Sequence, residues 1–328
     1  MQSDTLLQVR GLAVEFPIGG QWTRVVNDAR LSLARGETLG LVGESGSGKS
    51  ITSMAVLGLV SELGGRVASG SVRFDGEEVV GAKQGVLRRL RGQRIGMIFQ
   101  QPRRSLNPAF TVGDHIAETI RRHSRVSRAE AWKRAVSLLD RVGIPRAAER
   151  ASDYPHLFSG GMCQRVMIAM AISCEPKLLI ADEPTTALDV TVQAKVLELL
   201  RELVRESGMA MLFISHDLTV VSEVTQRVAV MYAGQTVEVG TTRQIFSQPL
   251  HPYTKALLAS IPGAGRQQRL KVIDGSIPPP TRMIPGCRFN PRCDCRLSDQ
   301  CQSRPVELVE MPDERSVRCL RADLAVAS

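Results

Sequence analysis

GESGSGKS, residues 43–50, stands between the apolar run TLGLV and the segment ITSMAVLGLV, whose pattern is that of a helix. The spacing G-x-x-x-x-G-K-S between a strand and a helix is typical of a phosphate-binding loop, in which glycines let backbone N–H groups turn toward phosphate oxygens. The N-terminus of the following helix adds a favourable dipole. We expect Lys49 to reach the β- and γ-phosphates of a nucleotide and Ser50 to bind Mg²⁺. The residues assigned to this nucleotide site are Gly43, Glu44, Ser45, Gly46, Ser47, Gly48, Lys49, Ser50 and Ile51.

The rest of the first 250 residues alternates short apolar runs with helical patterns, which indicates an α/β fold with a parallel sheet covered by helices. The stretches LLQVRGLAVEF and GSVRFDG instead read as antiparallel strands with glycine turns, so a small antiparallel β-layer is expected beside the parallel sheet. Buried strands are predicted at Thr38–Val42, Ile95–Phe99, Leu178–Ala181, Met211–Ile214 and Val228–Tyr232.

The domain organisation follows from where these patterns change. Strand signals stop between Pro102 and about Glu175, and amphipathic helices take their place, one of them opening with the capping-box sequence Ser127-Arg128-Ala129-Glu130. We therefore predict a helical subdomain at about residues 102–175. A boundary near Pro249 divides a nucleotide-binding domain, residues 1–249, from a C-terminal extension, residues 250–328, that holds a proline-rich linker and five cysteines.

Composition limits the partners. The net charge of +9 could indicate a nucleic-acid partner, but the arginines are scattered and often stand beside acids, as in Arg201-Glu202. A long basic block with interleaved aromatic residues, which single-strand binding favours, is missing, so we expect no nucleic-acid partner. The N-terminal sequence has no signal-peptide pattern, and no run approaches the roughly 18 apolar residues of a membrane span. We therefore expect a cytosolic chain.

The segment LLIADEP, residues 178–184, is an apolar strand that ends in two acids. Two carboxylates at a buried strand end are costly unless a cation or a reacting group occupies them. Asp182 is predicted to hold Mg²⁺, directly or through water. Glu183 is predicted to be the general base that orients and activates the attacking water.

The stretch FSGGMCQR lies just upstream of that strand, and its Ser159-Gly160-Gly161 matches the signature motif of the ATP-binding-cassette ATPases. The chain resembles that family, which implies a P-loop NTPase fold that binds ATP and Mg²⁺. It also implies a head-to-tail dimer, in which the signature of one subunit closes over the ATP of the other. Physical chemistry agrees, because Ser159 and the amides of Gly160 and Gly161 would form an anion site at the start of a helix.

The resemblance implies roles for further residues. Gln100 matches the glutamine that senses the γ-phosphate and Mg²⁺, and Asp189 matches an acid that crosses the dimer interface. His216 matches the switch histidine at the γ-phosphate, although a lone histidine is more often structural. Its neighbours suggest a Ser215-His216-Asp217 triad, which we reject because adjacent residues do not readily form that geometry.

An aromatic side chain is also expected against the adenine ring. Phe16 is the first candidate for this stacking partner and Trp22 the second. An aromatic residue in an edge strand more often serves packing, so the sequence leaves both interpretations open.

Three stretches narrow the resemblance: MIFQQPRRSLNP, YPHLFSGGM and HPYTKALLASIP are similar to ATPase subunits of bacterial dipeptide and oligopeptide importers, whose relatives import nickel. This implies a peripheral protein at the cytoplasmic face of the inner membrane. It also implies a heterodimer with a paralogous ATPase, beneath two permease subunits fed by an extracytoplasmic solute-binding protein. Other readings are an importer of nickel or another small solute, a soluble cassette ATPase acting on nucleic acid or ribosomes, and a regulator that binds ATP without hydrolysis. The single cassette argues against the soluble class, and Glu183 and His216 argue against the regulator.

The cysteines of the extension are Cys287, Cys293, Cys295, Cys301 and Cys319. A reducing cytosol disfavours disulfides, and zinc usually takes a C-x2–4-C pair that is missing here. Importers of the resembled type carry a C-x5-C-x6–7-C-x17-C segment associated with a 4Fe–4S cluster. The resemblance therefore implies cluster ligands at Cys287, Cys293, Cys301 and Cys319, with Cys295 spare; zinc is the second choice and free thiols the third.

Overall fold

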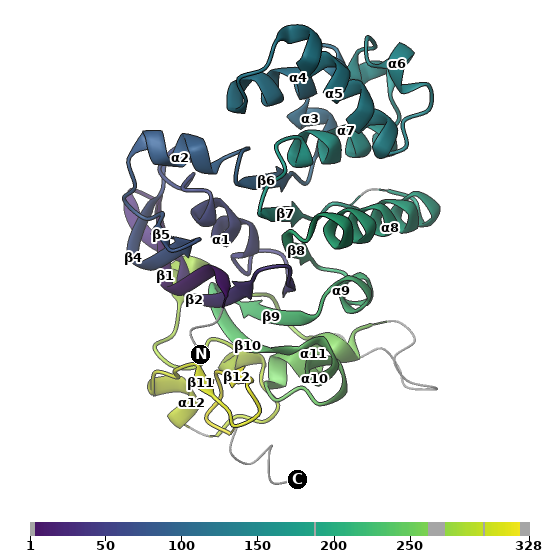
Figure 1. Cartoon of the computed structure of the whole chain (residues 1–328). Helices are drawn as coiled ribbons and strands as arrows, with labels where there is room; N and C mark the ends of the chain where they lie inside the picture. The colour runs from purple at the N-terminus through teal and green to yellow at the C-terminus, as the bar shows by residue number, and fades with distance from the viewer. Residues whose placement is uncertain (1–3, 187, 262–272, 298, 322–328) are drawn as a thin grey trace. The chain divides into compact units, whose positions relative to one another are not determined.

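The strand, loop and helix predicted around GESGSGKS are present in the computed structural model, where β3 (Thr38–Val42) leads through the loop into α1 (Lys49–Val56). The structure describes residues 4–186, 188–261, 273–297 and 299–321. By its internal contacts the chain forms two units, one of residues 1–34, 38–81 and 214–328, the other of residues 35–37 and 82–213. The expected boundary near Pro249 falls inside the first unit. Figure 1 labels the elements of both units.

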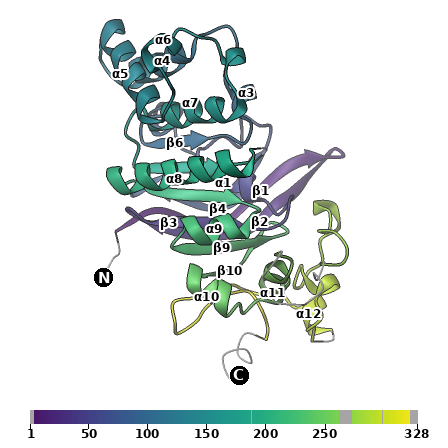
Figure 2. The ribbon, with the colours of Figure 1, turned by 90° about the vertical axis from the view of Figure 1, so that its right-hand side faces the viewer.

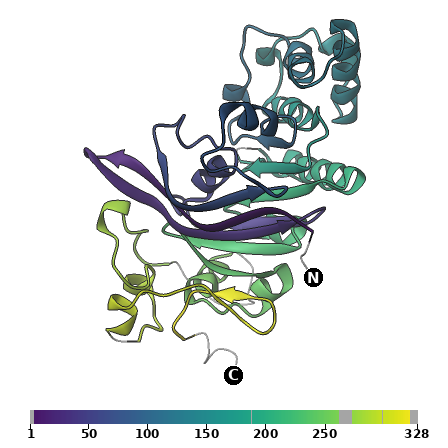
Figure 3. The same cartoon turned by 60° about the vertical axis from the view of Figure 1, so that its left-hand side comes forward.

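The first unit contains an antiparallel sheet in the order β2-β1-β4-β5. β1 and β2 form the long hairpin visible in Figure 3, closed by Gly19 and Gly20, both with positive φ. β2 was not predicted from the sequence, because polar residues interrupt its apolar ones. Gly11 lies within β1, where the register shifts, as in a β-bulge. The strands of this sheet are β1 (Thr5–Ile18), β2 (Gln21–Ala34), β4 (Arg66–Phe74) and β5 (Glu77–Glu78).

The other strands of the first unit follow the order β11-β12-β10-β9-β3. β3 and β9 pair in parallel and are almost entirely buried, which explains their continuous apolar sequences. The remaining pairs are antiparallel, so the C-terminal extension adds two short strands to the edge at β10. These strands are β9 (Arg227–Tyr232), β10 (Gln235–Thr241), β11 (Val309–Glu310) and β12 (Ser316–Val317).

The helices of the first unit are short and carry clear start signals. Asp217 caps α9 by accepting from the amides of Thr219 and Val220. Thr241 and Gln244 form a capping box at the start of α10, which packs beside β10 (Figure 2). Besides α1, the helices are α9 (Leu218–Val224), α10 (Thr242–Ser247), α11 (Pro252–Ala259), η2 (Pro280–Arg282), η3 (Asn290–Arg292) and α12 (Gln300–Ser303).

The second unit contains three strands in the order β8-β7-β6, with β6 and β7 parallel. The last two residues of β8 belong to the first unit. Each strand begins and ends within one residue of its predicted position. The strands are β6 (Ile95–Ile98), β7 (Leu178–Asp182) and β8 (Ala210–Ser215).

Between β6 and β7 the chain is helical, and α7 packs against α3, α4 and α5. Ser127 caps α5 by accepting from the amide of Glu130, while the Glu130 carboxylate pairs with Arg134, so half of the predicted capping box forms. No helix among the described residues has the length and apolar character needed to cross a membrane. The helices are α2 (Gln84–Leu90), α3 (Pro102–Ser105), α4 (Val112–His123), α5 (Arg128–Arg141), α6 (Ala147–Arg150), η1 (Pro155–Leu157), α7 (Gly160–Ile172) and α8 (Val190–Ser207).

Candidate functional site

The phosphate loop has a backbone that glycine alone can adopt at two points. A Cβ on Gly43, whose φ is +149°, would lie 2.1 Å from the carbonyl oxygen of Met231. A Cβ on Gly48, whose φ is +99°, would lie 3.2 Å from a methyl group of Val26. Side chains are thus excluded from both ends of a tight loop that leads into a helix N-terminus, the arrangement that binds phosphate through backbone amides.

Two side chains of the same loop are directed inward. The ammonium group of Lys49 is buried and donates to the carbonyl oxygens of Gly43 at 2.7 Å and Glu44 at 3.1 Å. The hydroxyl of Ser47 is buried and has no hydrogen-bond partner among the described residues. Since buried polar atoms are nearly always satisfied, this hydroxyl and the glycine-lined loop fit a nucleotide phosphate.

The two acids after β7 differ in their surroundings. Asp182 ends the strand and is 4% exposed, whereas Glu183 follows it in the left-handed region with φ +47°. One oxygen of Glu183 accepts from the amide of Gln100 at 2.7 Å and from the hydroxyl of Thr186 at 2.9 Å. Strained backbone of this kind persists where surrounding contacts hold it, frequently at functional sites. The structure thus places two predicted residues, Gln100 and Glu183, in contact. It adds a contact from Thr186, which was not predicted from the sequence.

The signature segment begins α7 as expected. Ser159 is the N-cap residue, and its hydroxyl accepts from the amide of Met162 at 3.3 Å. Gly161 is required by close packing, because a Cβ there would lie 2.6 Å from Val192 of α8. Asp189 caps α8 and accepts from the amide of the same Val192 at 2.9 Å. The signature and Asp189 therefore meet at one residue of α8.

The residues after β8 do not form a triad. The hydroxyl of Ser215 accepts from the amide of Asp217, and the Asp217 carboxylate caps α9. His216 is exposed at the end of β8. The geometry agrees with rejecting a nucleophile–base–orienter arrangement here.

The two aromatic candidates for adenine stacking lie on the β1–β2 hairpin. Phe16 is half-buried and pairs with Thr23, and its ring lies so close to Gly65 that a Cβ there would be 2.7 Å away. Trp22 is 47% exposed, and the guanidinium of Arg66 lies 4.3 Å from its ring centroid. The ring of Trp22 is thus partly covered by a cation, in a cation–π contact.

The five cysteines of the extension converge on one pocket, which we call the thiol pocket, with an internal volume of about 20 Å³. Burial raises the pKa of Cys287 and of Cys293 to about 11, and it also raises the pKa of Cys319. These thiols are therefore protonated at neutral pH. Among the described residues, no group of three or more histidine, cysteine or acidic side chains has an arrangement that could hold a metal ion. The pocket also includes Cys301, which was predicted as a ligand, and Cys295, which was predicted to be spare.

Similarity to known proteins covers nearly the whole chain. A match to the family described as ABC transporter spans residues 26–186, and a match to the family described as oligopeptide/dipeptide transporter, C-terminal region, spans residues 237–301. A Brucella abortus protein whose name describes a peptide import ATP-binding protein is 50% identical over 320 residues, which make up 97% of this chain and 96% of that protein. The oligopeptide transport ATP-binding protein AppD of Bacillus subtilis is 47% identical over 316 residues, 96% of each chain.

Solved structures of cassettes superpose on much of the chain. A dimeric ATP-binding cassette in a post-hydrolysis state, bound to ADP and Pi, gives a TM-score of 0.64 at 27% identity, over 73% of this chain and 99% of that one. The Clostridium perfringens protein cbiO1, part of an ABC transporter complex, gives a TM-score of 0.63 at 27% identity, over 75% of this chain and 92% of that one.

Proposed function

Because this chain belongs to the ATP-binding-cassette ATPases, we propose that it is the ATP-hydrolysing subunit of an importer of dipeptides and oligopeptides. The observation that carries the chemistry is Glu183, held in a strained conformation beside Asp182 by Gln100 and Thr186. The observation that carries the cargo class is the oligopeptide/dipeptide transporter match at residues 237–301, together with the peptide-import names of the relatives.

In this proposal the phosphate loop binds the nucleotide through its backbone amides, and Lys49 exchanges the loop carbonyls it now contacts for β- and γ-phosphate oxygens. Ser50, Gln100 and Asp182 would hold Mg²⁺, which neutralises phosphate charge when bound. Glu183 orients and deprotonates the attacking water. His216 contacts the γ-phosphate, and Phe16 stacks on adenine.

The second half of each site comes from a partner. Ser159, Gly160 and Gly161 offer an anion site at the N-terminus of α7, and Asp189 lies beside it at the start of α8. We propose that they close over ATP held by a paralogous ATPase in a heterodimer, as dimeric cassettes of similar fold support. Two permease subunits, fed by an extracytoplasmic solute-binding protein, would place this dimer at the cytoplasmic face of the inner membrane.

Uptake tests the cargo assignment. In cells lacking this chain, the wild-type gene should restore uptake of labelled dipeptides and oligopeptides, and the Lys49→Ala variant should not. Restored uptake of Ni²⁺ without any peptide uptake would transfer the assignment to a nickel importer. Peptide uptake restored equally by Lys49→Ala would overturn the proposed role of the phosphate loop.

For the extension, residues 250–328, we propose a 4Fe–4S centre on Cys287, Cys293, Cys301 and Cys319, with zinc as the alternative. Thiol donors suit either centre, and the five thiols share one pocket. A pocket of about 20 Å³ is too small for a cluster, so binding requires these thiols to move apart.

Metal content distinguishes the two centres. Protein purified without oxygen should contain iron and sulfide, Cys295→Ser should retain both, and Cys301→Ser should lose both. A colourless protein that contains stoichiometric zinc would show that the centre is zinc and not a cluster. A protein that contains neither iron nor zinc would show that the five thiols are free.

A further inference from the structure

The C-terminal extension contacts the phosphate loop at Glu44. The guanidinium of Arg292 donates to both carboxylate oxygens of Glu44, at 3.0 and 3.1 Å. The side chain of Arg292 is 6% exposed and that of Glu44 is 27% exposed, so the pair is largely removed from solvent. Ion pairs of this kind are costly to break, because one charge is then left buried without a partner.

The rest of the Arg292 guanidinium is anchored within the same unit. Its other nitrogen atoms donate to the carbonyl oxygens of Asp274, at 2.9 Å, and Ile273, at 3.2 Å. The linker that follows these two residues lines an open cleft of about 450 Å³ whose other wall includes Glu44, Ser45 and Gly46. Arg292 therefore ties the first half of the loop to the linker of the extension.

A second contact holds the backbone of Glu44. Its amide donates to the hydroxyl of Tyr253 at 2.9 Å. Tyr253 is fully buried on α11, and its ring packs against Tyr232, at 4.6 Å between centroids, and Phe289, at 5.4 Å. Burial raises the pKa of Tyr253, so its hydroxyl stays neutral and accepts this bond over the whole physiological range.

Electrostatics explains why a loop that binds phosphate needs this brace. A carboxylate at Glu44 would repel the phosphates of a nucleotide, since like charges in a partly dry site interact strongly. Arg292 neutralises that carboxylate and turns it away from solvent, and Tyr253 fixes the adjoining peptide.

We propose that Arg292 and Tyr253 are positioning residues through which the C-terminal extension holds the phosphate loop ready for the nucleotide and removes the repulsion of Glu44. This inference rests on the proposed function, because it assumes that the loop binds ATP. It predicts that the extension sets nucleotide affinity and leaves the chemical step unchanged.

The test is a set of ATP dissociation constants, measured by calorimetry on the full chain with Mg²⁺. Arg292→Gln should weaken ATP binding about tenfold, with an unchanged kcat at saturating ATP in the assembled transporter. Adding Glu44→Gln to that variant should restore most of the affinity, because no uncompensated carboxylate remains. Tyr253→Phe should weaken binding about threefold.

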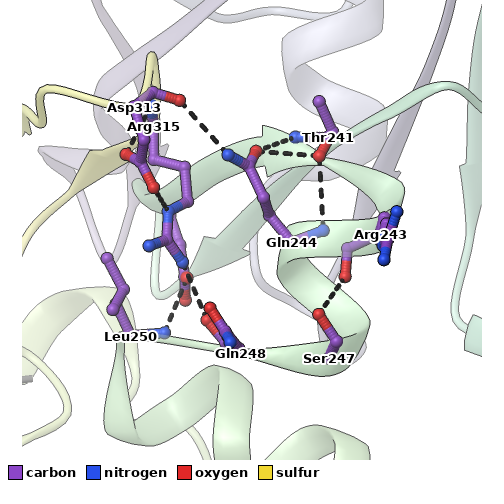
Figure 4. A network of polar contacts seen from close by, with 9 residues as sticks. Thr241, Arg243, Gln244, Ser247, Gln248, Leu250, Asp313 and Arg315 are labelled. Carbon is purple, nitrogen blue, oxygen red and sulfur yellow. Dashed lines mark hydrogen bonds and ion pairs between the residues drawn. The ribbon is translucent and has the colours of Figure 1, made fainter. Parts of the chain in front are cut away.

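Arg315 provides a matched control in the same extension. Its side chain is 8% exposed, and it binds the Asp313 carboxylate and the Gln248 carbonyl oxygen (Figure 4). Arg315→Gln removes an equally buried guanidinium and should leave the ATP dissociation constant within twofold of wild type.

Two results would overturn the inference: an unchanged dissociation constant in Arg292→Gln, or a loss that Glu44→Gln does not relieve. If Arg292→Gln does not fold, Tyr253→Phe decides, and unchanged binding in that variant counts against the brace. Lys49→Ala separates this inference from the proposed function. If Lys49→Ala still binds ATP as tightly as wild type, the ATP site itself is contradicted. If Lys49→Ala weakens ATP binding but Arg292→Gln does not, only the brace is contradicted.

Discussion

The phosphate loop and the thiol pocket lie in the same unit, and both were recognised from short sequence patterns. In the loop, the structure shows the backbone that the motif requires, because Gly43 and Gly48 have positive φ and a Cβ would lie 2.1 Å from the Met231 carbonyl oxygen and 3.2 Å from Val26, respectively. In the thiol pocket, the five cysteines meet, yet burial raises the pKa of Cys287, Cys293 and Cys319, and the pocket residues have no metal-holding arrangement. A site made of backbone amides is formed by local geometry, whereas a site made of side-chain ligands also needs its ion to set protonation and spacing.

The largest expected effect is a loss of ATP binding at the loop that leaves the thiol pocket unchanged. Lys49→Ala removes the ammonium that is poised at the loop carbonyls. ATP affinity should fall by on the order of 100-fold or more, because a charge-assisted contact to phosphate is lost. Calorimetric titration with ATP measures the loss. Iron, zinc and thiol content should match wild type, and a change in them would mean that the two regions are not independent.

Glu183→Gln separates ATP binding from ATP hydrolysis. The amide cannot accept the proton of water, so hydrolysis should fall about 10³-fold while ATP binding is retained. The assay is phosphate release by the complete transporter in which the partner's general base has also been replaced. Turnover near the wild-type rate in that background would remove Glu183 from the proposed mechanism.

Two glycine substitutions test how strictly the loop backbone is determined. Gly43→Ala would place Cβ 2.1 Å from the Met231 carbonyl oxygen, which should cost about 3 kcal/mol or more of unfolding free energy. Gly46→Ala is the matched control, since its Cβ meets nothing within 4 Å and only the φ of +81° is unfavourable. The expected cost there is about 1 kcal/mol. Urea unfolding compares them, and equal costs would contradict the steric argument.

The smallest effect concerns the wall of the thiol pocket. Burial lowers the pKa of His251 to about 3, so between pH 6.5 and 3 the unfolded chain binds a proton that the folded chain does not. The contribution of His251 to stability is complete above pH 6.5 and declines as the pH falls through that window. Moving from pH 7.5 to 5.5 should therefore lower the free energy of unfolding by about 1.4 kcal/mol through this group.

His251→Asn isolates that contribution. Asparagine preserves an acceptor for the Tyr253 amide, which His251 binds at 3.0 Å, and it does not titrate. Burial also raises the pKa of Glu238, which acts in the opposite direction but equally in both proteins. Urea unfolding at the two pH values should show the 1.4 kcal/mol difference, and identical pH dependence would show that folding does not lower the pKa of His251.

Much of the fold was predictable because its signals are local. Continuous apolar runs located β3, β6, β7, β8 and β9, and the helix starts predicted at Ser127 and Ser159 are capped by these residues. β2 was missed because its pairing with β1 is long-range and its own sequence alternates irregularly.

The candidate nucleotide site was predictable for the residues that belong to spaced motifs. Gln100 and Glu183 were each predicted as site residues, and a hydrogen bond of 2.7 Å joins them. Thr186 was missed, because a threonine after two acids and a proline carries no signal of its own. Arg292 and Tyr253 were missed because hundreds of residues separate them from Glu44, and no periodicity encodes such a contact.

The sequence by itself determined the phosphate loop, the acidic pair Asp182 and Glu183, the signature and the family, because each depends on residue types at fixed short spacings. Only the tertiary structure decided that the extension contacts the loop at Glu44, that all five thiols share one pocket, and that Thr186 binds Glu183. The physical reason is that side chains far apart in the chain acquire their burial, partners and pKa values only when packing brings them together.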